Sequence, residues 1–214
     1  MFNRILTAFA LAAAVSFAPA GLAQAPEAGV DYTVLAETQP TESAGKVEVT
    51  EFFWYGCPHC HSLEPALAAW VKTLPADVSF RRVPAFFNRQ WEIGARTYYA
   101  LEAIGEADRL HKPLFDAVHR DGLRASDEKA IAEFLARNNV DMAKYSAAYK
   151  SFGVESKLRR TEQLVKGYKL DGVPALAVNG KYVVSASQAG GQKRMLDVTD
   201  MLINQSRKEI AAKK

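Results

Sequence analysis

The two cysteines of this chain, Cys57 and Cys60, lie three positions apart in the segment Cys57-Pro58-His59-Cys60. A disulfide between them would close a loop so short that it restrains the unfolded chain very little. A structural role therefore accounts poorly for the pair, whereas a Cys-x-x-Cys spacing is typical of sites that exchange thiols and disulfides. The spacing predicts a redox-active disulfide, with a structural disulfide or a metal-binding pair as the alternatives.

The cysteine pair stands between a predicted strand and a predicted helix. Residues 46–54 end in a near-continuous apolar run, which indicates a buried strand. Beyond Gly56, residues 57–74 show the apolar spacing of a helix. The first turn of a helix offers unpaired N–H groups and a partial positive charge, and both stabilise an anion. We therefore expect Cys57 to be the nucleophile, with a lowered pKa, and Cys60 to be its less exposed partner one turn later.

The residues around the cysteines suit a site at the start of a helix. Pro58 fits the first turn, where its missing N–H would be unpaired in any case. His59 is able to place a positive charge beside the thiolate. His61 is interpreted as a solvent-facing helix residue, and Tyr55 is expected to line a substrate surface. His111 and His119 are expected to be ordinary residues of the helical region.

Glu51 is the candidate for proton transfer near the cysteines. It lies in the predicted buried strand, six residues before Cys57. A carboxyl beneath the active site could carry protons to and from Cys60. Strand alternation turns either Arg81 or Arg82 inward as a partner, and the sequence does not decide which. A plain salt-bridged or edge carboxylate is the alternative for Glu51, and a solvated pair is the alternative for the arginines.

Apolar periodicity divides the rest of the chain into a sheet part and a helical part. Strands are predicted at 32–35, 78–83, 175–178 and 181–185, the last two forming a hairpin around Asn179-Gly180. Helices are predicted at 91–104, 106–119, 126–138, 156–168 and 195–210, with a weaker one at 141–149. This order predicts an α/β protein. Residues 24–87 and 164–214 are expected to form a discontinuous sheet domain, and residues 88–163 an inserted helical domain.

Composition and charge exclude several classes of protein. The 214 residues are 49% hydrophobic and 24% charged, as expected of a globular protein with a sizeable core. The 27 Lys and Arg residues nearly balance 24 Asp and Glu, so nucleic acid is not expected as a partner. Two cysteines exclude a disulfide-dense scaffold. No second Cys/His pair completes a metal site, and no heptad or assembly segment stands out, so a monomer without bound metal is expected.

The N-terminal segment Met1–Ala23 is typical of a cleaved secretory signal peptide. Arg4 supplies the positive start, residues 5–17 form the apolar centre, and small residues lead to cleavage after Ala23. An uncleaved anchor helix is the alternative. Export places the cysteines in an oxidising compartment, where two neighbouring thiols are normally joined.

The segment from Glu51 to Cys60, the Gly172-Val173-Pro174 stretch and the helical region between them resemble the DsbA family of periplasmic thiol oxidases. The resemblance covers essentially the whole chain after the signal peptide. It implies a thioredoxin fold with an inserted all-helical domain and a cis Val173–Pro174 bond facing the cysteines. An acidic residue at the position of Glu51 is also a feature of this family.

The resemblance further implies an activity and its partners. A dithiol oxidase of this kind donates its Cys57–Cys60 disulfide to newly exported or unfolded proteins with free thiols, through a mixed disulfide at Cys57. A membrane oxidase of the DsbB type then reoxidises the pair, and no cofactor beyond the disulfide is needed. A disulfide reductase or isomerase of the same fold is one alternative. A peptide-binding holdase with incidental cysteines is the other.

Overall fold

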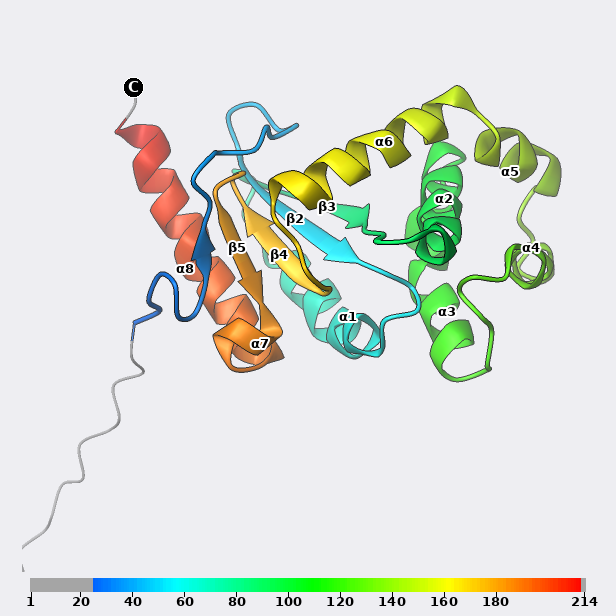
Figure 1. Cartoon of the computed structure of the whole chain (residues 1–214), viewed down its shortest axis with the longest axis horizontal. Helices are drawn as coiled ribbons and strands as arrows, with labels where there is room; N and C mark the ends of the chain where they lie inside the picture. The colour runs from blue at the N-terminus through cyan, green and yellow to red at the C-terminus, as the bar shows by residue number, and fades with distance from the viewer. Residues whose placement is uncertain (1–24, 213–214) are drawn as a thin grey trace, which may run out of the picture.

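The structure, a computed structural model, describes residues 25–212. Its strands are β1 (Thr33–Val34), β2 (Val47–Phe53), β3 (Val78–Pro84), β4 (Ala175–Val178) and β5 (Tyr182–Ser185). They form a mixed sheet in the order β1-β5-β4-β2-β3, with helices on both faces and at one end (Figure 1). β2 and β3 are parallel, and the other neighbouring strands are antiparallel.

β2 is a central strand that is covered on both faces. All seven of its residues are buried, which explains the near-continuous apolar run in the sequence. Val47 and Val49 pack into the core on one face of the sheet, and Phe52 packs into the core on the other face. Helix α1 (Pro58–Val71) begins shortly after β2 ends. The short connection therefore places the cysteine motif at the end of the central strand.

Two helices cover the first face of the sheet, and one covers the second. On the first face, α1 and α8 (Gln192–Ala211) pack against β2, β4 and β5 through residues such as Leu63, Leu67, Met195, Val198 and Leu202. On the second face, the C-terminal part of α6 (Phe152–Gly167) packs through Leu164 and Val165. These layers fix the start of α1 against the sheet.

Four further helices form a block at one end of the sheet, on the right in Figure 1. They are α2 (Arg89–Ala103), α3 (Ala107–His119), α4 (Glu128–Arg137) and α5 (Met142–Tyr149). The apolar core of this block also contains Phe53, Tyr55, Cys57 and Cys60. The redox motif is therefore packed between the sheet and the helical block.

Each strand and helix that periodicity predicts is present, with small differences at the ends. α6 begins at Phe152 rather than at residue 156, because the Ser151 hydroxyl caps the helix by accepting the N–H of Val154. The sequence analysis did not predict α7 (Ala186–Ala189), because a single turn is too short to show a helical period.

Two predictions about chain organisation stay predictions. The signal peptide Met1–Ala23 lies outside the described residues. The division into residues 24–87 with 164–214 and an inserted 88–163 domain is untested, and its second boundary falls inside the unbroken helix α6. Within residues 25–212, no helix is long and apolar enough to cross a membrane.

Candidate active site

Cys57 and Cys60 occupy the first turn of α1. Cys57 is the N-cap of the helix, and its Sγ accepts the backbone N–H of Cys60 at 3.3 Å. Pro58 is the first helical residue, where its missing N–H costs no hydrogen bond. Both cysteines are free thiols, so the structure shows the reduced form of the pair.

The surroundings of the two thiols move their pKa values in opposite directions. A hydrogen bond with the Cys60 side chain lowers the pKa of Cys57 to about 6, and the backbone N–H groups of Cys60 and His59 and the charge of His59 act in the same direction. Burial raises the pKa of Cys60 well above its usual range, and the neighbouring Cys57 adds to this effect. The exposed fraction is 6% for Cys57 and 0% for Cys60. Cys57 is therefore the thiol that ionises more readily, and it is the more exposed of the two.

The loop before β4 lies against the cysteine pair. Its Val173–Pro174 bond is cis, as expected from the resemblance, and the Cys57 thiol donates to the Val173 carbonyl at 3.3 Å. A groove of about 1060 Å³ adjoins this contact, and His59, Pro174 and Gln192 are among its lining residues. The Gln192 side chain donates to the His59 carbonyl at 2.9 Å, which ties the start of α8 to the motif. His59 itself is exposed.

Glu51 lies on β2 directly opposite Arg82 of β3. Arg82 Nε donates to Glu51 Oε2 at 3.0 Å, and Glu51 is fully buried. Burial raises the pKa of Glu51 to about 8, because it outweighs the attraction of Arg82. Glu51 thus holds a proton near neutral pH, and it is one of the groups that raise the pKa of Cys60.

Comparison with known proteins identifies the family. A family model described as a DSBA-like thioredoxin domain matches residues 48–200. The chain belongs to the DsbA family. The thiol:disulfide interchange protein DsbA of Azotobacter vinelandii is 44% identical over 179 residues, which are 84% of this chain and 84% of that protein. The protein of the same name from Pseudomonas aeruginosa is 39% identical and covers 100% of both chains.

Solved structures of DsbA proteins have the same fold as this chain. The crystal structure of Pseudomonas aeruginosa DsbA has a TM-score of 0.83 and 38% identity, covering 88% of this chain and 97% of that one. The oxidoreductase DsbA from Xylella fastidiosa has a TM-score of 0.80 and 32% identity, covering 85% and 98%. The predicted thioredoxin fold with added helices is confirmed. This DsbA-family chain is a thiol:disulfide oxidoreductase, and its family works with a redox-active disulfide.

Sequence analysis missed two residues near the site of this DsbA-family chain. Glu64 of α1 and His111 of α3 are both buried, and the interpretation of His111 as an ordinary helix residue stays a prediction. Arg82 Nη2 donates to Glu64 Oε1 at 3.0 Å, and His111 Nε2 lies 3.4 Å from Glu64 Oε2. Glu64 was detectable, because it follows Cys60 by four residues and shares its helix face. His111 left no such signal, because only the fold brings α3 beside α1.

Glu51, Glu64 and His111 also resemble a set of metal ligands, because their ligand atoms lie within 4.8 Å of one another. Arg82, however, donates to both carboxylates from within this group. The positive charge that the carboxylates require is therefore supplied by the protein itself. The arrangement fits an ion-pair network better than a metal centre.

Arg82, rather than Arg81, faces the redox site. Arg81 Nε donates to Glu48 Oε1 at 3.0 Å and to the Thr50 hydroxyl at 3.2 Å. Since successive side chains of a strand point to opposite faces, Arg81 and Arg82 lie on opposite faces of the sheet. The choice that the sequence left open is settled by the register of β2 against β3, which pairs Glu51 with Arg82.

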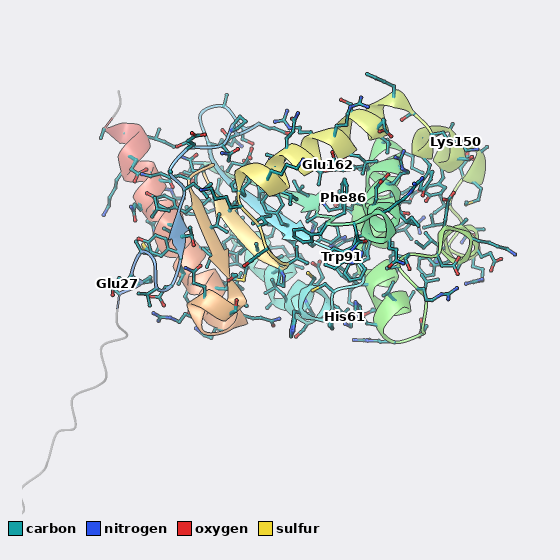
Figure 2. All side chains as sticks on the ribbon, in the orientation of Figure 1. Glu27, His61, Phe86, Trp91, Lys150 and Glu162 are labelled. Atoms are coloured by element: carbon teal, nitrogen blue, oxygen red, sulfur yellow. The ribbon has the colours of Figure 1, made fainter. Side chains whose placement is uncertain are left out.

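The predictions for Tyr55 and His61 were wrong, whereas the interpretation of His119 as an ordinary residue of the helical region stays a prediction. Tyr55 is 1% exposed and packs in the core of the helical block, so it does not line a substrate surface. His61 lies between α1 and α3, with its Nε2 2.8 Å from Asp116 Oδ1 (Figure 2). The His61 ring stacks on His119 with centroids 4.8 Å apart, and His119 Nε2 contacts the Tyr55 carbonyl at 2.8 Å.

The aromatic residues at the junction of sheet and helical block are packed to different extents. Phe86 is buried (Figure 2). The Trp91 ring stacks on the Trp54 ring with centroids 3.8 Å apart. Phe87 is 42% exposed and packs edge-on against the Trp91 ring, with centroids 5.3 Å apart. Packing of Trp54, which directly precedes Tyr55, holds the connection between β2 and the cysteine motif.

Proposed function

We propose that this chain is a periplasmic dithiol oxidase that gives its Cys57–Cys60 disulfide to newly exported proteins. The observation that carries the proposal is the asymmetry of the two thiols, one with a lowered pKa and the other fully buried. A stabilised Cys57 thiolate stabilises the reduced form, and a disulfide whose reduced form is stabilised is readily given away. Family membership and the signal-peptide pattern of Met1–Ala23 support the periplasmic location.

The reaction begins when a substrate thiolate attacks Cys57 Sγ. The Cys57–Cys60 bond breaks, the Cys60 sulfur leaves with the electron pair, and a mixed disulfide joins Cys57 to the substrate. A second substrate thiolate then attacks the substrate sulfur of this mixed disulfide, and Cys57 leaves as a thiolate. The substrate loses two electrons and two protons. The cysteine pair gains two electrons and one proton, because Cys60 is protonated and Cys57 is not, and the other proton is released to the solvent.

Glu51 is proposed as the group that supplies the proton to Cys60. Like Cys60 it is fully buried, it holds a proton near neutral pH, and in its ionised form it raises the pKa of the Cys60 thiol. A buried thiolate is costly, so a proton delivered as Cys60 leaves lowers the energy of the step. Glu51 takes the proton back when the pair is reoxidised.

Substrates are proposed to bind in the groove beside the motif. The groove contains His59 and the cis Pro174, so a peptide in it lies next to Cys57. Pro58 fixes the first turn of α1, and the Val173 carbonyl lies 3.3 Å from Cys57 Sγ, so both are proposed to help position the reactive sulfur. A membrane oxidase of the DsbB type is proposed to reoxidise Cys57 and Cys60, a step supported by family membership.

The equilibrium potential of the Cys57–Cys60 pair in glutathione buffers tests this function. We expect a reduction potential of about −120 mV, the established value for DsbA, rather than about −270 mV as in thioredoxin. A value near that of thioredoxin would indicate a reductase instead. The variant C57A separates the oxidase from a holdase with incidental cysteines. If the protein is an oxidase, C57A no longer oxidises a dithiol peptide. If the protein is a holdase, C57A still binds peptides as the unmodified protein does.

A further inference from the structure

Glu51, Glu64, Arg82 and His111 form a buried cluster between β2, α1, β3 and α3. The exposed fraction is 0% for Glu51, 6% for Glu64 and 3% for His111. Two carboxyl groups in this cluster share one guanidinium, that of Arg82. In a buried site, two negative charges are not balanced by one positive charge, so one carboxyl keeps its proton near neutral pH.

The contacts of the two carboxyls show which one carries the charge. Glu64 receives Arg82 Nη2 at 3.0 Å and 3.3 Å on its two oxygens, and His111 Nε2 lies 3.4 Å from Oε2. Glu51 receives Arg82 Nε on Oε2, and its Oε1 has no hydrogen-bond partner among the described residues. More donors surround Glu64, so the charge rests on Glu64 and the proton on Glu51.

Arg82 contacts both carboxyls, whereas His111 lies beside Glu64 and therefore favours the ionised form of Glu64 over that of Glu51. The hydroxyl of Tyr55 lies 3.2 Å from His111 Nδ1. When this hydroxyl donates to Nδ1, the ring proton is on Nε2, the atom that faces Glu64. The contact with Glu64 falls short of hydrogen-bond geometry, and its effect is electrostatic. Burial lowers the pKa of His111, so the ring is neutral and acts as a dipole.

We propose that His111 is a positioning residue that keeps Glu64 ionised and so leaves the one shared proton on Glu51, the carboxyl that serves Cys60. Its consequence for Cys60 rests on the proposed function, whereas the placement of the proton does not. The other titratable groups that act on the cluster are Tyr55 from the connection after β2, Cys60 from α1, Tyr98 from α2 and Asp108 from α3. Burial raises the pKa of Tyr98, so it stays neutral and does not compete for the proton.

Carbon-13 NMR of the glutamate side chains, with Glu51 and Glu64 assigned from E51Q and E64Q, measures the proton on each carboxyl separately. In the unmodified reduced protein we expect protonated Glu51 to predominate near neutral pH. In H111M, which removes the donor at similar volume, the ratio of protonated Glu51 to protonated Glu64 should fall by at least about tenfold, one pKa unit of relative affinity. H111Q restores a donor near the position of Nε2 and should return the ratio towards its original value.

Two results overturn the proposal: an unchanged ratio in H111M, or protonated Glu64 in excess in the unmodified protein. A residue that only filled space would lower stability in H111M and H111Q alike and leave the ratio unchanged. Y55F provides a second variant, because it removes the hydroxyl that orients the His111 ring. If H111M does not fold, an unchanged ratio in Y55F overturns the proposal.

The rate of Cys57–Cys60 disulfide reduction by a peptide dithiol links the proton to the chemistry. If Glu51 supplies the proton, the pH at which this rate is halved should move down in H111M and not in H111Q. The glutathione potential is measured on the same samples. A potential like that of thioredoxin contradicts the proposed function and leaves the NMR result standing, whereas a DsbA-like potential with unchanged carboxyl ratios contradicts only the role of His111.

Discussion

Cys57 and Val173 are 116 residues apart in the chain, and the thiol of one donates to the carbonyl of the other at 3.3 Å. The first residue follows β2 and the second precedes β4, which are antiparallel neighbours in the sheet. Pairing of these two strands therefore brings the start of α1 against the cis-proline loop. The reactive sulfur is held in place by the sheet as well as by its own helix.

Replacing His59 with Gln should raise the pKa of Cys57 modestly. The His59 charge is one of several causes of the low value of about 6, after the hydrogen bonds with Cys60 and the backbone. We expect a rise of less than about one unit. The ultraviolet absorbance of the thiolate, followed against pH, measures it. H61Q is the matched control, because His61 pairs with Asp116 and should leave Cys57 unchanged; an equal shift in both variants contradicts the assignment.

The reduced protein should gain stability over the oxidised protein as pH rises. The pKa of Cys57 is lowered from 9.0 to about 6 on folding, so its contribution is fully present above pH 9 and is lost as pH falls through 6. The oxidised protein has no thiol to titrate. Urea unfolding of both forms between pH 6 and pH 9 measures the free energy of unfolding of each. The value for the reduced protein should rise relative to that of the oxidised protein as pH rises. C57A should unfold without this trend, and a persisting trend would point to another group.

Glu51 should make the oxidised protein less stable at higher pH. Its pKa is raised from 4.5 to about 8 on folding, so its contribution is present below pH 4.5 and is lost as pH rises through 8. The loss should be on the order of a few kcal/mol across this window. E51Q should remove the decline when unfolding is followed against pH. E48Q, on the other face of the sheet, should keep it; a decline that survives in E51Q excludes Glu51 as its source.

Replacing Gly56 with Ala should disturb the stacked tryptophans before the motif. A Cβ at this position would lie 2.4 Å from the Trp54 ring, which stacks on Trp91. We expect a loss of about 1–3 kcal/mol, because the ring must move within a packed region. Denaturant unfolding and tryptophan fluorescence measure the effect. In G153A the nearest atom is at an ordinary 3.7 Å, so an equal loss in both variants would argue against the steric cause.

The sequence by itself determined the chemistry of this protein and the order of its elements. The Cys-x-x-Cys spacing, the buried strand before it and the Pro58 at the helix start depend on neighbours along the chain, and local periodicity reports such features directly. The position of Glu51 in a buried strand was readable for the same reason. The family resemblance extended these local signals to the fold and to the cis Val173–Pro174 bond.

Only the tertiary structure decided which distant side chains meet at the site. The register of β3 against β2 selects Arg82 over Arg81, and the packing of α3 on α1 brings His111 to Glu64. The same packing buries Tyr55, which the sequence placed on a surface. The physical reason is that contact between distant residues depends on the face that each element presents to its neighbours. That face is set by the combined packing of the sheet, α1 and the helical block, and no single segment of the sequence contains it.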